Sequence, residues 1–207
     1  MNTVEIRNPE GTELLGEVEL TDPAEVAAVV GRAVKARRAW TEMPIGRRAD
    51  LLDAAAALLE PEVEPLGRLL ASESGKPIGQ ATNEVRGGLH FLRGNATEGR
   101  RLVGRMLPSE SNARSEWDLA FTRREPLGVV AAILPFNFPV ELFVEKCAAA
   151  LVGGNAVVVK PPIEDPLVVG RFREALIEGG VPAEVIAAVH GDAKVGAALA
   201  EAPGVDA

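Results

Sequence analysis

The second half of the chain alternates short, continuous apolar runs with helical stretches, and this alternation limits the possible folds more than any other feature. The runs are GVVAAIL, AVVVK and VIAAVH, beginning at Gly128, Ala156 and Val185. An apolar run without polar alternation is typical of a strand buried on both faces of a parallel sheet. Helical patterns follow the runs, over 139–152, 167–178 and 194–201. The sequence therefore predicts an α/β fold with a partial doubly wound (Rossmann-like) parallel sheet over 128–207.

The first half is predicted to be mostly helical. Asp22-Pro23-Ala24-Glu25 combines a capping side chain, a proline in the first turn and an early acid, which is typical of a helix start. Apolar residues at helical spacing continue this helix and predict three more, over 47–59, over 62–74 and from Pro77 onward. A polar connection over 104–116 and an amphipathic strand over 117–125 follow. We expect N-terminal strands and helices in 1–103, a connecting strand region in 104–127 and the α/β region in 128–207.

Composition excludes several classes of protein. The chain has 30 acidic and 22 basic residues, and this acidic balance disfavours a nucleic-acid partner. With one cysteine, Cys147, the chain cannot form a disulfide scaffold. No apolar segment is long enough to span a bilayer, and the N-terminus has no apolar signal segment. We therefore expect a cytoplasmic protein with neither a membrane nor a nucleic acid as its partner.

Polar or turn-forming residues follow each predicted inner strand. They are Pro135-Phe136-Asn137, Lys160-Pro161 and His190-Gly191. The carboxyl ends of parallel strands meet at one edge of a sheet, so we expect a ligand site there. No G-x-G-x-x-G motif follows any of the strands. A pyrophosphate could still bind at the start of the last helix, where the turn from Gly191 to Gly196 leads into it.

Each candidate residue also has a structural explanation. The Asn137 amide can donate to a developing oxyanion, but an asparagine before a proline-initiated helix can instead cap that helix, and spacing alone favours the cap. Lys160 can bind ribose hydroxyls or phosphate, or can be a surface lysine. Cys147, in an alanine-rich helix, is expected to be a buried, inert thiol. His90 and His190 are 100 residues apart in the sequence, so a zinc site or a serine–histidine triad has little support.

Several motifs together resemble the aldehyde dehydrogenase superfamily. They are REPLGVV (124–130), ILPFNFP (133–139), GNAVVVKP (154–161), ESGKP (73–77), Val181-Pro182 and the run from Gly191 to Leu199. The resemblance extends over nearly the whole chain, from about Val4 to Asp206, and the order of the motifs corresponds to the N-terminal portion of the family's members. The sequence around FTRREPLGVV is most similar to the corresponding sequence of members that act on small polar aldehydes, such as lactaldehyde dehydrogenases.

The resemblance implies NAD(P)-dependent oxidation of an aldehyde, in which a thiolate attacks the carbonyl carbon and a hydride passes to nicotinamide. It implies that Asn137 is the catalytic side chain that donates to the oxyanion. It assigns cofactor contacts to nine positions, with no metal: Ile133, Leu134, Pro135, Phe136, Lys160, Pro161, Ile163, Gly191 and Gly196. In this set Lys160 would hold the adenosine ribose.

Two departures from the family pattern change these expectations. Ile163 stands where the family commonly has a glutamate that binds the ribose 2′-hydroxyl. Because this carboxylate is missing, we expect the site to accept NADP as well as NAD. The chain contains no counterpart of the family's nucleophilic cysteine or general-base glutamate, and Cys147 does not align with the former. We therefore expect the cofactor-binding part of such an enzyme, inactive alone and acting on a small aldehyde only when completed.

The sequence leaves two alternative functions open. One is a standalone nucleotide-binding or scaffold protein, and the other is a different enzyme that reuses Asn137 to polarise a carbonyl. In each case a three-stranded sheet would leave backbone groups unpaired at an edge. We therefore expect a homo-oligomer or a complementary polypeptide as partner.

Overall fold

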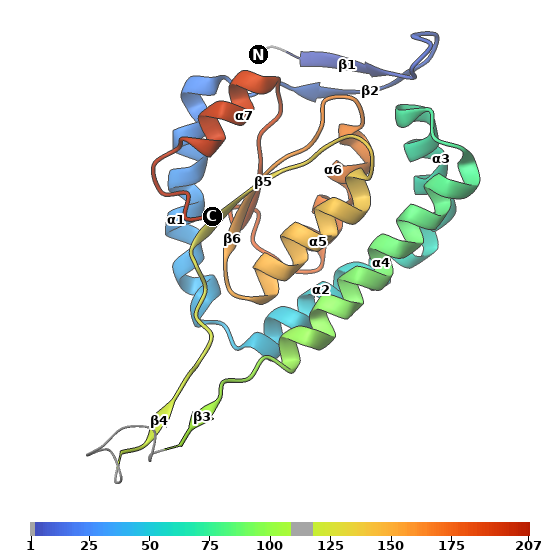
Figure 1. Cartoon of the computed structure of the whole chain (residues 1–207). Coiled ribbons are helices and arrows are strands. Elements are labelled where there is room, and N and C mark those ends of the chain that lie inside the picture. The colour runs from blue at the N-terminus through green and yellow to red at the C-terminus, as the bar shows by residue number, and fades with distance from the viewer. Residues whose placement is uncertain (1–2, 109–117) are drawn as a thin grey trace.

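The computed structural model describes residues 3–108 and 118–207 (Figure 1). Its strands are β1 (Thr3–Arg7), β2 (Leu14–Glu19), β3 (Met106–Leu107), β4 (Ala120–Phe121), β5 (Val129–Ile133), β6 (Ala156–Lys160) and β7 (Ile186–Ala188). Its α-helices are α1 (Val26–Glu42), α2 (Ile45–Leu59), α3 (Val63–Ser74), α4 (Ile78–Arg100), α5 (Pro139–Val152), α6 (Pro166–Glu178) and α7 (Ala193–Ala200). Short 3-10 turns at Pro23–Glu25 and Glu60–Glu62 lead into α1 and α3.

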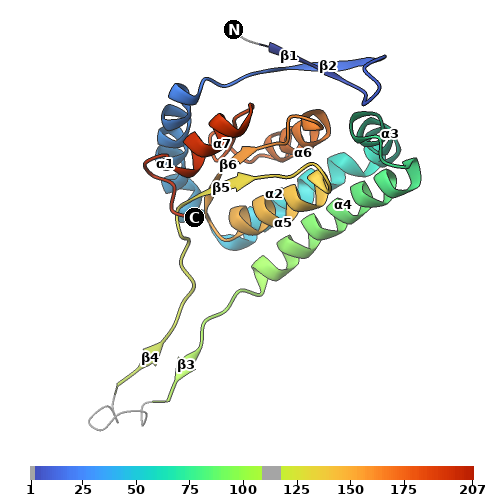
Figure 2. The same cartoon turned by 45° about the horizontal axis from the view of Figure 1, so that its top comes forward.

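The predicted parallel sheet is confirmed. Its strands lie in the order β5-β6-β7, with Val129 opposite Ala156 and Val157 opposite Ile186. Every residue of the central strand β6 is buried, as its continuous apolar run predicts. Helices α1 and α7 pack on one side of this sheet, and α5 and α6 pack on the other (Figure 2). Helix α2 lies against α5 and α6, and α4 lies against α5, so the crossover helices are covered as well.

The predicted amphipathic strand over 117–125 is mostly wrong. Only Ala120–Phe121 is a strand, and it pairs with Met106–Leu107 inside the segment expected to be a polar connection. Trp117, and residues 109–116 of that connection, lie outside the described residues. The hairpin extends away from the helices and the sheet (Figure 2). Because nothing in the described residues packs against it, side chains such as Met106 and Phe121 stay 76% and 66% exposed, and the pairing stays short.

The expected open edges of the sheet are partly covered. Beside β5, the Asp206 N–H donates to the Val129 carbonyl, and the Ala131 N–H donates to the Ala207 carbonyl, each at 2.8 Å. At the other edge, Arg173 Nε donates to the Ile186 carbonyl of β7 at 2.6 Å. The last two residues and one arginine thus satisfy some of the backbone groups that were expected to be unpaired at an edge.

Both ends of α5 are held by the N-terminal helices. At its start, the Val140 N–H donates to Oε1 of Glu84 in α4 at 3.0 Å. At its end, Trp40 Nε1 donates to the Leu151 carbonyl and Arg48 Nε to the Val152 carbonyl, at 3.0 and 3.1 Å. Free N–H groups at the start of a helix and free carbonyls at its end need such partners when they are buried. Side chains of the first hundred residues therefore satisfy α5 at both ends.

Helix α6 begins on two buried carboxyl groups. Glu73, at the end of α3, accepts hydrogen bonds from the N–H groups of Leu167 and Val168 at 2.7 and 3.0 Å. Asp165, just before the helix, is fully buried, and neither of its carboxyl oxygens has a hydrogen-bond partner among the described residues. Burial, reinforced by the charge of Glu73, raises the pKa of Asp165 to about 8. Burial also raises the pKa of Glu73 to about 7, against the opposing effect of its backbone hydrogen bonds.

The contribution of the Arg48 guanidinium to stability can be tested by replacing this residue. It also donates to the carbonyls of Trp40, Thr41 and Met43, so Arg48→Met would leave several buried oxygens without donors. We expect the free energy of unfolding to fall by about 2–4 kcal/mol, measured by urea denaturation. The exposed neighbour offers a matched control, and Arg47→Met should change the value by less than about 0.5 kcal/mol. Equal losses in both variants would contradict this account.

The two carboxyls predict a pH dependence of stability. Their pKa values in the folded state lie above the unfolded values of about 4, so the folded state holds more protons between about pH 4 and pH 8. These groups therefore lower the free energy of unfolding as the pH rises through that window. Asp165→Asn should stabilise the protein at pH 8 by about 1–3 kcal/mol and much less at pH 4. Urea denaturation at both pH values measures this, with the exposed Glu10→Gln as control; an unchanged pH slope in Asp165→Asn would refute it.

Candidate functional site

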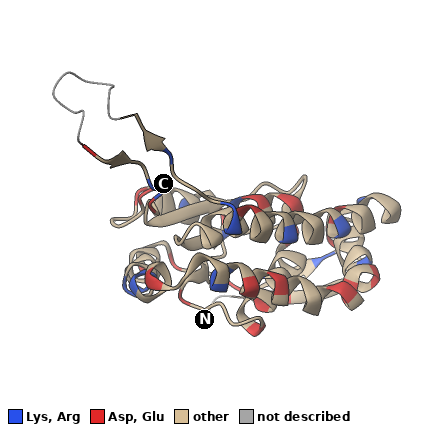
Figure 3. Ribbon diagram, turned by 90° about the horizontal axis from the view of Figure 1, so that it is seen from below, with Lys and Arg blue, Asp and Glu red and all other residues tan. Residues whose placement is uncertain are grey.

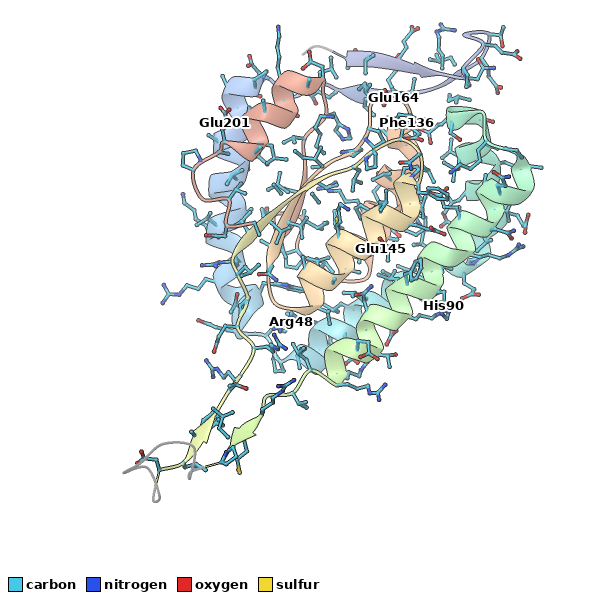
Figure 4. All side chains as sticks on the ribbon, in the orientation of Figure 1. Arg48, His90, Phe136, Glu145, Glu164 and Glu201 are labelled. Carbon is cyan, nitrogen blue, oxygen red and sulfur yellow. The ribbon has the colours of Figure 1, made fainter. Side chains whose placement is uncertain are left out.

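The carboxyl ends of the three parallel strands surround a surface cavity of about 330 Å³. The segment after β5 contributes Leu134, Pro135 and Phe136, the segment after β6 contributes Lys160, Pro162, Ile163 and Glu164, and the turn after β7 contributes Gly191, Asp192 and Ala193. Phe136 and Glu164 lie close together at this end of the sheet (Figure 4). Six of the nine predicted cofactor positions therefore line one cavity.

A second cavity, of about 710 Å³, adjoins the first and shares Ile163, Gly191 and Asp192 with it. Its other wall comes from the N-terminal segment that links β2 to α1, including Thr21, Asp22 and Pro23. This segment is fixed to the end of β7, because the Thr21 N–H donates to the His190 carbonyl at 2.8 Å. Sequence reasoning identified Asp22-Pro23 only as a helix start and missed its place beside the strand ends.

Lys160 ends β6 with its side chain largely inside the protein. The residue is 8% exposed, and Nζ lies 3.4 Å from the Pro161 carbonyl. Burial lowers the pKa of its ammonium group, while the nearby charges of Glu164 and Asp192 oppose that shift. The reading of Lys160 as a simple surface lysine is therefore wrong. A cation held at this rim can donate to hydroxyl or phosphate oxygens.

The turn after β7 needs a glycine. A Cβ on Gly191 would lie 2.4 Å from Cγ2 of Val195 in α7, a distance that packed atoms do not tolerate. Gly196, one residue further along α7, faces the Lys160 side chain, with 3.6 Å between its ideal Cβ position and Cδ of Lys160. Gly191 therefore lets the turn pass close to α7, whereas a side chain at Gly196 would make an ordinary contact with Lys160. The start of α7 is capped by Asp192, whose Oδ1 accepts from the Lys194 N–H at 2.8 Å, so a carboxylate already occupies this helix terminus.

Asn137 is exposed, and its side-chain amide makes no hydrogen bond to any residue that the structure describes. The alternative reading of Asn137 as a helix cap is wrong, because Phe138 occupies the N-cap position of α5 and it is Glu84, not Asn137, whose side chain accepts from an N–H of the first turn. The backbone of Asn137 is held instead: its carbonyl accepts from Lys76 Nζ at 2.8 Å. The amide is therefore free to donate to a ligand next to the strand ends.

Several residues that the sequence placed near the strand ends do not line this cavity: Ile133, Asn137, Pro161, His190 and Gly196. Pro161 and His190 line a separate cavity of about 240 Å³ on the side of α6 and β2. Burial, together with the charges of Arg173 and Lys160, lowers the pKa of His190, so the imidazole is neutral at pH 7. Ile133 lines none of these three cavities and is 42% exposed at the end of β5.

Cys147 is buried, as expected. Its residue exposure is 0%, and burial raises the pKa of the thiol well above its usual range. A buried neutral thiol is a poor nucleophile. Among residues 3–108 and 118–207, no group of three or more His, Cys, Asp or Glu side chains is placed to hold a metal ion.

Two surface properties agree with the composition. Basic and acidic residues are interspersed along the helices in the view of Figure 3. Within the described part of the chain, no helix has the length and apolar character required to cross a bilayer.

Comparison with known proteins links this arrangement to a family. The model of the aldehyde dehydrogenase family matches residues 1–207. The chain is 34% identical over 196 residues to an aldehyde-dehydrogenase-like protein of Sinorhizobium fredii, covering 95% of this chain and 38% of that protein. It is 36% identical over 206 residues to alpha-ketoglutaric semialdehyde dehydrogenase of Bacillus subtilis, covering 99% and 41%.

A solved structure agrees with the sequence relatives. NADP-dependent glyceraldehyde-3-phosphate dehydrogenase of Bacillus halodurans, in complex with NADP, matches with a TM-score of 0.93 and 37% identity, over 99% of this chain and 43% of that one. The chain thus spans about two fifths of the length of these relatives and corresponds to their N-terminal portion. The chain belongs to the aldehyde dehydrogenase family.

Proposed function

We propose that this chain binds NADP or NAD at the carboxyl ends of β5, β6 and β7 and presents the Asn137 amide to the carbonyl oxygen of an aldehyde. The observation that carries the proposal is the single cavity shared by Leu134, Phe136, Lys160, Ile163 and Gly191. In a parallel α/β sheet this edge is where nucleotides bind. When bound, the dinucleotide supplies the acceptor for the hydride that leaves the aldehyde carbon.

The residues on this rim support distinct tasks. Lys160 donates to ribose hydroxyls, and Gly191 lets the chain turn tightly beside the adenosine half. Asn137 donates to the oxygen that becomes negative when a nucleophile adds to the carbonyl, without bringing a negative charge of its own. We place the attacking thiolate outside residues 1–207, because Cys147 is the only cysteine in them and is buried. This division of labour favours the cofactor-binding part of a dehydrogenase over a scaffold protein.

The side chain at position 163 supports NADP as a cofactor. Ile163 lines both adjoining cavities and carries no charge that would repel a 2′-phosphate. The Bacillus halodurans relative is NADP-dependent and was solved with NADP bound. Glu164 and Asp192 lie on the same rim, so NADP is accepted rather than strongly preferred.

A small polar aldehyde is the substrate class that we propose. The names of the relatives include alpha-ketoglutaric semialdehyde and glyceraldehyde-3-phosphate, which are both small polar aldehydes. The similarity around FTRREPLGVV supports a lactaldehyde-like substrate within that class.

The hairpin of β3 and β4 supports the proposal of a second copy of this chain as a partner. Its apolar side chains Met106, Leu119 and Phe121 are each at least 66% exposed, and the hairpin extends away from the sheet (Figure 2). Exposed apolar surface of this kind is typical of a protein–protein contact.

Nucleotide binding is tested by titrating the chain with NADP and NAD in a calorimeter. Lys160→Met should weaken the binding of both nucleotides about tenfold or more, because it removes a charged donor to the ribose. The exposed Lys35→Met, on α1, is the matched control and should leave both affinities unchanged. Absence of saturable binding by the parent chain, or unchanged affinities in Lys160→Met, would overturn the proposal.

The role of position 163 is tested by restoring a carboxylate. Ile163→Glu should lower the affinity for NADP relative to NAD by about tenfold, since a carboxylate repels the 2′-phosphate and can accept from a 2′-hydroxyl. Ile163→Gln has the same size without the charge and should change this ratio by much less. If both variants shift the ratio equally, charge at this position does not select the cofactor.

A further inference from the structure

We propose that Lys76 is a positioning residue for Asn137: its ammonium group fixes the backbone at the start of α5, so that the Asn137 amide is held toward the carbonyl oxygen. This inference rests on the role of Asn137 proposed above. Lys76 is 61 residues away in the sequence and belongs to the turn between α3 and α4. Neither cavity at the strand ends includes it, so its contribution is separate from nucleotide binding.

The ammonium group of Lys76 has three partners. Nζ donates to the Asn137 carbonyl at 2.8 Å, forms an ion pair with Oε2 of Glu84, and lies 4.5 Å from the centre of the Phe138 ring. An ammonium group has three N–H donors; the two oxygens accept from it, and the Phe138 ring adds a cation–π contact. The Lys76 side chain is 14% exposed and that of Glu84 is 1% exposed, so water screens this pair little.

Glu84 connects the same network to the next turn of α5. Its Oε1 accepts from the Val140 N–H at 3.0 Å, while its Oε2 pairs with Lys76. The segment from Asn137 to Val140 is therefore tied at its first carbonyl and at its last N–H to one lysine–glutamate pair. A buried ion pair with further hydrogen bonds on both partners is a rigid support, and removing one partner leaves an uncompensated charge.

The turn that carries Lys76 is fixed by a glycine. Gly75 ends α3 with φ of 73°, in the left-handed region that favours glycine. Its N–H donates to the Ala71 carbonyl at 2.9 Å, and Pro77 then precedes α4. This geometry directs Lys76 toward the start of α5, not into solvent.

Asn137 needs such support because its own side chain has none. It makes no hydrogen bond to the described residues, so its direction depends on the backbone that carries it. A donor to a developing oxyanion is effective only when its direction is set before the reaction. In this structure the contact with Lys76 is the only side-chain hydrogen bond to the Asn137 backbone from a described residue.

The test measures the order of Asn137 directly. In the 15N-labelled chain, Lys76→Met should lower the heteronuclear NOE of the Asn137 side-chain amide and raise hydrogen exchange of the backbone amides of Phe138 and Val140 about tenfold or more. Lys76→Arg keeps a cationic donor and should restore most of both signals. If Lys76→Met folds poorly, Glu84→Gln serves instead, since it keeps an acceptor for Val140 but removes the charge that holds Lys76.

Val85→Ala separates positioning from general stability. Val85 is fully buried in α4 next to Glu84, so its truncation should destabilise the same helix without touching the lysine. We expect the Asn137 amide signal to stay as in the parent chain in Val85→Ala. A loss of order equal to that of Lys76→Met, or no loss in either Lys76→Met or Glu84→Gln, would overturn the inference.

NADP titration of Lys76→Met separates this inference from the proposed function. The affinity should stay within about twofold of the parent value, because Lys160, Ile163 and Gly191 are untouched. A parent chain that binds no nucleotide would refute the proposed function, whereas the NOE comparison would still decide the role of Lys76. A large loss of NADP affinity in Lys76→Met would contradict a role confined to Asn137.

Discussion

The structure depends on supplying partners to the buried ends of α5. Its first free N–H groups and its last carbonyls lie inside the protein, where each unsatisfied group would be costly. Glu84 serves the start, and Trp40 and Arg48 serve the end. The helical region and the parallel sheet are therefore joined by directional hydrogen bonds as well as by apolar contact. The segment that carries Asn137 directly precedes this helix, so fixing the start of the helix also fixes that segment.

The sequence predicted the central sheet well because its signal is local. Strand β6 is a continuous apolar run, and its burial follows from composition alone. The meeting of strand ends at one cavity also follows from topology, which is why the sequence alone places Lys160 and Gly191 together. Helix ends were predicted to within a few residues where proline or glycine marks them, as at Pro139 and Gly75.

The features that the sequence did not predict are long-range contacts and positions that depend on packing. The bond between Glu84 and Val140 joins residues 56 apart, and no spacing rule identifies it. Pro161 and His190 follow strand ends yet line the cavity on the other side, because successive residues of a strand point to opposite faces. The segment expected to be a strand over 117–125 had the right alternation but no surface to cover, so only two of its described residues pair. Asn137 matched a helix cap in sequence, and only geometry shows that Phe138 occupies that position.

The hydrogen bond from Arg173 to Ile186 has a consequence for how the chain avoids aggregation. An unpaired carbonyl on an edge strand can accept a hydrogen bond from another extended polypeptide, which then adds to the sheet. The arginine that covers this carbonyl precedes it by 13 residues and comes from helix α6, which packs beside the strand. A foreign strand that pairs with β7 at Ile186 must therefore first displace a charged side chain that this fold has placed there.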